Sequence, residues 1–169
     1  AAKTLNYLTE HGITEYDVLA SRVETAAADF ETVSISIKQM EHRMEQIAAL
    51  KTHIINYAKT RNTYLAYRKT KAADKPAFRA AHETDLLLHE AAKRAFDALG
   101  VKKLPTVKVL QAEYTDLLAK KKAAYEDFKR LRQENQELQA VKSNVDSLLQ
   151  IKQEEKKEQK QEKKQEQDR

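Results

Sequence analysis

The chain has 169 residues and a formal net charge of +5; 34% of its residues are charged and only 7% are aromatic. The absence of cysteine rules out disulfide scaffolds, thiol nucleophiles and cysteine-based zinc sites. Two glycines are too few for a glycine-rich phosphate-binding loop. Ala, Glu, Lys, Leu and Arg supply just over half of the residues, as in coiled coils and long helices, so we expect an all-α chain.

We expect a short helix in residues 1–12, ending near Gly12, and a long helix over residues 15–70, which contain neither glycine nor proline. Thr14 is expected to cap the long helix, with Asp17 as its acidic partner three residues later. Along this helix, ten apolar residues recur at alternating steps of three and four, which is the pattern of a coiled-coil seam. They are Tyr16, Leu19, Val23, Ala26, Phe30, Val33, Ile37, Met40, Met44 and Ile47.

A second, shorter helix is expected over residues 75–99. Asp74 can cap its first turn, Pro76 is tolerated within that turn, and Gly100 can end the helix in a left-handed conformation. Its predicted inward face consists of Phe78, Ala81, Leu88, Ala92, Ala95, Phe96 and Leu99.

A third helix is expected over residues 107–150, with Thr106 as its cap. Its seam runs through thirteen positions, of which ten are apolar, and Asn135 is a polar seam residue of the kind that sets register. The positions are Val107, Leu110, Tyr114, Leu117, Lys121, Ala124, Phe128, Leu131, Asn135, Leu138, Lys142, Val145 and Leu149.

Two long seams joined by a shorter helix predict an elongated antiparallel coiled-coil hairpin in residues 13–151, with the shorter helix (residues 75–99) packed at the basic loop end. No hydrophobic residue follows Ile151. We therefore expect residues 152–169 to form a charged Gln/Glu/Lys tail, either as a helical extension or as a disordered segment.

Positive charge is concentrated around the predicted hairpin tip. Residues 59–108 contain twelve Lys or Arg against five Asp or Glu, whereas residues 1–58 contain five against eight. A local basic cluster attracts nucleic-acid phosphates, although an ordinary solvated basic face has the same composition. The predicted phosphate-contacting residues are Arg61, Arg68, Lys69, Lys71, Lys75, Arg79, Lys102 and Lys103.

Tyrosines are interleaved with these cations. Tyr64 and Tyr67 are candidates for stacking on exposed bases, which is how many single-strand-binding proteins hold nucleic acid. The competing interpretation is that Tyr57 and Tyr64 pack against the second helix.

The spacing of His82, Asp85 and His89 puts them on one helical stripe, where they could in principle hold a metal ion for a hydrolase. They lack the paired histidines four residues apart and the adjacent glutamate of a HExxH site. We therefore expect surface or interhelical hydrogen-bonding histidines, and we predict no catalytic residue, metal or cofactor.

Several segments are similar to the C-terminal helical region of relaxases, the mobilization nucleases (MobA/VirD type) of conjugative and mobilizable elements in Gram-positive bacteria. The segments are YLTEHGIT (7–14), IAALKTHIINY (47–57), YLAYR (64–68), LHEAAK (88–93), LGVKKLP (99–105), LQAEY (110–114) and VKSNVDSLL (141–149). The resemblance implies an accessory part of a longer DNA-nicking protein, and the absence of an initiator methionine fits such a part. The catalytic tyrosine and histidine-bound metal of a relaxase belong to an N-terminal α/β domain that this sequence does not match, so no residue here inherits those roles.

We therefore predict a non-catalytic accessory module that contacts DNA or docks the transfer machinery. Its partners would be DNA, other conjugation proteins or a second copy of the chain. The alternative is a structural coiled-coil spacer or dimerisation module that binds no nucleic acid. Because no apolar run approaches the roughly 20 residues of a membrane span and no signal peptide is visible, we expect a cytoplasmic protein without membrane insertion.

Overall fold

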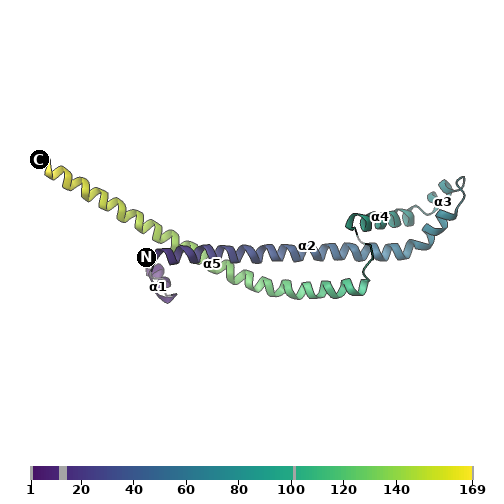
Figure 1. The fold of residues 1–169 in the computed structure, drawn as a ribbon, viewed down its shortest axis with the longest axis horizontal. Coiled ribbons are helices and arrows are strands. Elements are labelled where there is room, and N and C mark those ends of the chain that lie inside the picture. Colours follow the sequence, from purple (N-terminus) through teal and green to yellow (C-terminus); the bar gives the residue numbers. More distant parts are fainter. Residues whose placement is uncertain (1, 12–14, 101, 169) are drawn as a thin grey trace. The chain divides into compact units, whose positions relative to one another are not determined.

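The computed structural model describes residues 2–11, 15–100 and 102–168, and these residues form helices and connecting turns without any strand. The prediction of an all-α chain is confirmed. In chain order the helices are α1 (Ala2–Glu10), α2 (Tyr16–Lys69), α3 (Lys75–Ala81), α4 (Glu83–Leu99) and α5 (Val107–Gln167) (Figure 1). None of them is both long enough and apolar enough to cross a membrane.

Most predicted helix boundaries are found where the sequence places them. Gly100 has a φ of 64°, the left-handed conformation that ends α4, and the Thr106 hydroxyl accepts a hydrogen bond from the Val109 N–H at 3.2 Å. Pro76 lies in the first turn of α3, but Asp74 makes no side-chain capping bond there, so that cap was predicted wrongly. The predicted Thr14 cap lies outside the described residues.

The helix predicted over residues 75–99 is two helices, α3 and α4, separated at His82. His82 leaves the helical region with φ −126° and ψ 29°, and its N–H bonds back to the carbonyls of Phe78 and Arg79. The buried face of α4 also differs from the predicted inward face. Leu86, His89, Ala92 and Phe96 are buried on α4, whereas three residues of the predicted inward face are exposed, namely Ala81, Leu88 and Leu99.

The chain divides into two compact units. The first comprises residues 1–36 and 124–169. Its core contains Leu19 and Ala26 from α2 and Leu138 and Val141 from α5. Tyr16 of α2 donates a 2.5 Å hydrogen bond to Asp146 of α5, and farther along α2 the ring of Phe30 lies 5.1 Å from that of Phe128. Residue numbers therefore rise along α2 as they fall along α5, so the two segments are antiparallel in this unit.

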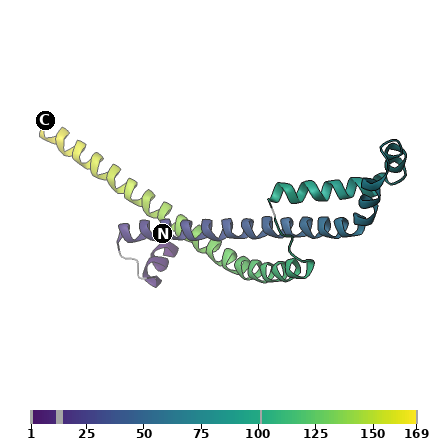
Figure 2. The ribbon, with the colours of Figure 1, turned by 45° about the vertical axis from the view of Figure 1, so that its right-hand side comes forward.

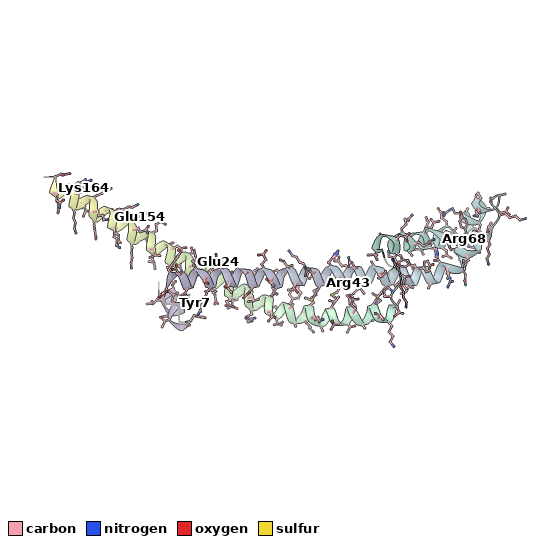
Figure 3. The ribbon with its side chains drawn as sticks, viewed as in Figure 1. Tyr7, Glu24, Arg43, Arg68, Glu154 and Lys164 are labelled. Carbon is pink, nitrogen blue, oxygen red and sulfur yellow. The ribbon has the colours of Figure 1, made fainter. Side chains whose placement is uncertain are left out.

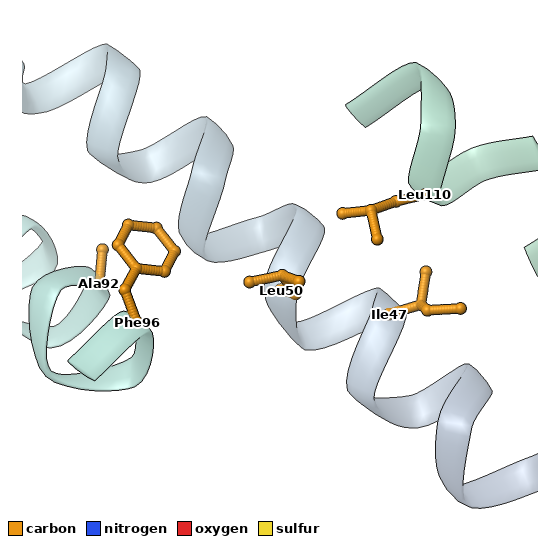
Figure 4. Close-up of a cluster of buried hydrophobic side chains, with 5 residues drawn as sticks. All are labelled: Ile47, Leu50, Ala92, Phe96 and Leu110. Carbon is orange, nitrogen blue, oxygen red and sulfur yellow. The ribbon is translucent and has the colours of Figure 1, made fainter. Parts of the chain in front are cut away.

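The second unit comprises residues 37–123. In it α4 lies alongside α2 (Figures 1 and 2), and α5 also packs on α2 through Leu110. Figure 4 shows the shared core, in which Leu110 points toward Ile47; its other members are Leu50, Ala92 and Phe96.

Ion pairs flank this core and align α2 with α5. Arg43 binds both carboxylate oxygens of Glu113, at 2.7 and 3.1 Å, and Lys121 lies 3.3 Å from Glu41. The hydrogen bonds from Arg43 hold the pKa of Glu113 below its ordinary value. As residue numbers rise along α2 they fall along α5, so these segments too are antiparallel.

Both predicted seams are confirmed over most of their length. All α2 seam positions are buried or half-buried except Tyr16, which is 41% exposed. On α5 the same holds from Val107 to Val145, including the polar Asn135, whereas Leu149 is exposed. The seam stops there because α2 begins at Tyr16, opposite Asp146, and offers no partner farther along α5. The tail continues α5 as a helix to Gln167, with every described residue from 152 onward exposed.

Candidate nucleic-acid interface

The predicted phosphate-contacting residues lie at the end of α2, on α3 and in the segment before α5. Arg61, Arg68 and Lys69 belong to α2, and Figure 3 marks Arg68 at the end of that helix. Lys71 follows in the turn, while Lys75 and Arg79 are on α3. Lys75 and Arg79 are half-buried, and the exposed members of the set are Arg61, Arg68, Lys69, Lys71, Lys102 and Lys103.

These residues form two separate groups. Lys102 and Lys103 precede Leu104, which packs against the core at Ile47 and Leu50. From Leu50 to Arg68, α2 advances about 27 Å at 1.5 Å per residue. Lys102 and Lys103 therefore do not belong to the basic group at the end of α2 and on α3.

Most of these cations have no acidic partner in the part of the chain that the structure describes. Arg79 pairs with Glu90 at 2.5 Å, which partly neutralises its charge. No ion pair among the described residues involves any of the other seven basic candidates. Uncompensated cations on one surface produce the positive potential that attracts a phosphate backbone.

The ring of Tyr67 contacts two of the cations, Lys75 and Arg79. The Lys75 Nζ lies 5.3 Å from its ring centroid and the Arg79 guanidinium carbon lies 5.5 Å from it, while the Phe78 ring is 6.1 Å away. These distances are typical of cation–π contacts, which position Lys75 and Arg79 beside the ring.

Tyr64 belongs to a stack of rings between α2 and α4. The His89 ring lies between those of Tyr57 and Tyr64, with centroid distances of 4.5 and 4.2 Å and interplanar angles near 20°. Lys93 lies over Tyr64 at 5.1 Å. The interpretation in which Tyr57 and Tyr64 pack against the following helix is confirmed, and one face of the Tyr64 ring is already occupied by His89.

His89 is a fully buried interhelical histidine, 1% exposed. Its Nδ1 lies 3.0 Å from the Thr60 hydroxyl, and that hydroxyl donates to the Asn56 carbonyl at 2.6 Å. Because Thr60 has one hydroxyl hydrogen, the Nδ1–H of a neutral His89 donates to the Thr60 oxygen. Thr60 was missed at the sequence level, although its spacing from Tyr57 and Tyr64 puts it on the same side of α2.

The three residues considered for metal binding have separate partners. Asp85 accepts a hydrogen bond from Thr63 at 3.2 Å, His82 packs on the Phe78 ring at 4.4 Å, and His89 bonds to Thr60. Within the described part of the chain, no group of three or more His, Cys, Asp or Glu side chains is arranged to hold a metal ion.

We expect acid to weaken the docking of α4 on α2. Burial, and then the positive charge of Lys93, hold the pKa of His89 below its ordinary value of 6.5. The unfolded chain therefore takes up this proton at a higher pH than the folded chain does. The stability that neutral His89 contributes is fully present above pH 6.5, and it is lost as the pH falls from there through the pKa of His89 in the folded chain.

Amide hydrogen exchange of α4, measured between about pH 8 and pH 5, checks this expectation. Protection should fall with pH in the native chain and become insensitive to pH in His89→Gln, which cannot titrate. The exposed His42→Gln serves as the matched control and should keep the native pH dependence. If His89→Gln and His42→Gln respond alike to acid, then His89 is not the titrating group.

Comparison with known proteins found no matching family model, no matching curated protein and no matching solved structure. The feature that most favours a nucleic-acid interface is the basic group at the end of α2 and on α3, in which only Arg79 has an ion pair within the described part of the chain.

Proposed function

We propose that the chain is a non-catalytic helical accessory module of a DNA-mobilization protein, acting in the cytoplasm, and that it contacts DNA through phosphates. The observation that carries this proposal is a group of exposed cations, Arg61, Arg68, Lys69 and Lys71, that form no ion pair with any described residue. The resemblance of several segments to the C-terminal region of relaxases supports the same role. Other proteins of the transfer machinery are further proposed partners.

The proposed architecture is an antiparallel coiled-coil hairpin of α2 and α5 with α3 and α4 at its basic end. Opposite chain directions within each unit support it, as do the two long seams. A long helix suits this role because it holds Arg61, Arg68 and Lys69 in a constant arrangement without needing a large core.

Fluorescence anisotropy with labelled single-stranded and duplex DNA tests the proposal. Binding should weaken steeply with salt, because each neutralised phosphate contributes about 0.9 to the slope of log K against log salt on duplex DNA. The triple variant Arg68→Glu, Lys69→Glu, Lys71→Glu should bind more weakly and with a shallower slope.

The matched control changes the net charge by the same amount in the exposed tail, with Lys156→Glu, Lys157→Glu and Lys160→Glu. The proposal requires the α2 variant to lose far more affinity than this control. It is wrong if the native chain binds neither form of DNA at low salt, or if the two triple variants weaken binding equally.

A second candidate function is a protein-interaction module that binds no nucleic acid. It is favoured by the exposed leucines of α4, Leu87 at 50% and Leu99 at 49%. In that case neither DNA form would bind, while the oligomeric state would depend on concentration.

A further inference from the structure

Helix α4 has a second apolar face, on the side away from α2. Its first face, with Leu86, His89, Ala92 and Phe96, is buried. The second face is at least partly open to solvent and consists of Leu87, Leu88, Ala91, Ala95, Ala98 and Leu99. A helix that is apolar on two opposite sides is normally buried on both, so the second face calls for another contact.

The residue types on this face follow nearly the same order whether α4 is read from its N-terminus or from its C-terminus. Leucines stand at the two ends and alanines in the middle. If a second α4 lies antiparallel with residue 93 at the centre, Leu87 faces Leu99 of the second copy and Ala91 faces its Ala95. The small central side chains let the helices approach closely, while the leucines at each end fill the space beside them.

The charges beside this face are complementary in the same arrangement. Glu90 and Arg94 lie four residues apart and hence on one flank of α4. In the antiparallel pair, Glu90 lies within about 3 Å, along the helix axis, of Arg94 of the second copy, and the symmetry repeats the contact. Arg79 uses only one oxygen of Glu90, Oε1, so Oε2 remains for this contact.

We propose that α4 is a homodimerisation surface, on which a second copy of this chain docks antiparallel through Leu87, Ala91, Ala95 and Leu99, flanked by Glu90–Arg94 pairs. A contact limited to one helix of this length is small, so the dimer is weak and depends on concentration. The inference does not rest on DNA binding, although Glu90 also pairs with Arg79, one of the proposed phosphate-contacting residues.

Analytical ultracentrifugation of the full chain over a range of concentrations is the primary test. A monomer–dimer equilibrium is expected. Arg94→Glu places two carboxylates opposite each other and should raise the dimer dissociation constant roughly tenfold or more. Arg132→Glu, the same charge change at an exposed position of α5, should leave it unchanged.

A charge-swap mixture makes the test specific for the proposed pairing. In Arg94→Glu both charged residues of this flank are acidic, and in Glu90→Arg both are basic, so each variant alone should dimerise poorly. Mixed together, they should form a heterodimer at least as readily as the native chain forms its dimer. A native chain that stays monomeric at every concentration overturns the proposal, as does a dimer that Arg94→Glu leaves intact or a mixture that fails to associate.

Because the chain has no cysteine, disulfide trapping can establish the register. Oxidising a mixture of Ala91→Cys and Ala95→Cys should give mainly the mixed disulfide, since these positions face each other in the antiparallel pair. Predominant linkage of Ala91→Cys to itself would indicate a parallel contact and contradict the proposed arrangement.

Discussion

Replacing Ile47 with alanine should lower the free energy of unfolding of the second unit by about 2–5 kcal/mol. Ile47 is 0% exposed and packs in the core where Leu110 meets it from α5 and Ala92 and Phe96 come from α4. The substitution removes apolar contact area and leaves a cavity in a core to which α2, α4 and α5 all contribute side chains. The loss of stability should appear in the segments of α2, α4 and α5 that contribute to this core.

Hydrogen exchange of the amides in α4 and in residues 107–123 measures the change within this unit. The matched control is Ile55→Ala, on the same helix, where the side chain is 52% exposed; its effect should stay within about 0.5 kcal/mol. Equal losses for the two variants would mean that Ile47 does not have the buried position described.

The second large effect is expected in the first unit, for Leu138→Asp. Leu138 is 3% exposed and packs with Leu19, Ala26 and Val141. The variant loses this apolar contact and places a carboxylate in an apolar core, which should cost about 3–5 kcal/mol at neutral pH. We expect the α2 and α5 segments of this unit to separate.

The loss of stability caused by Leu138→Asp should become smaller as the pH falls. Burial raises the pKa of the introduced aspartate above its unfolded value of about 3.9, so the penalty is largest at neutral pH and shrinks as acid protonates the side chain. Amide exchange in residues 16–36 and 124–145 measures it. Leu148→Asp, at a position 47% exposed, is the control and should show neither the loss nor the pH dependence.

The long seams could be predicted from the sequence because a repeat of three and four residues determines which side of a helix is apolar, wherever its partner comes from. Gly100 and Thr106 could be predicted as boundaries for a similar reason, since their effect on the backbone is local. Asp74 shows the limit of such reasoning, because a residue suited to capping still needs its side chain to meet a free N–H.

The phase of α4 could not be predicted. Leu86, Leu87 and Leu88 are consecutive, and periodicity alone cannot decide which of them faces the core. In the structure Leu86 is buried together with His89, Ala92 and Phe96. Leu87 and Leu88 lie on the open face from which we infer a second copy.

The sequence by itself determined the all-α class, the two seams and the concentration of basic residues between positions 59 and 108, because composition and spacing along one helix suffice for each. Only the tertiary structure decided that Arg79 is paired with Glu90, that Tyr64 stacks on His89, and that Lys102 and Lys103 stand apart from the basic group at the end of α2 and on α3. These outcomes depend on which side chains of different helices meet. That is set by how the helices dock and turn against one another, and spacing within a single helix carries no information about it.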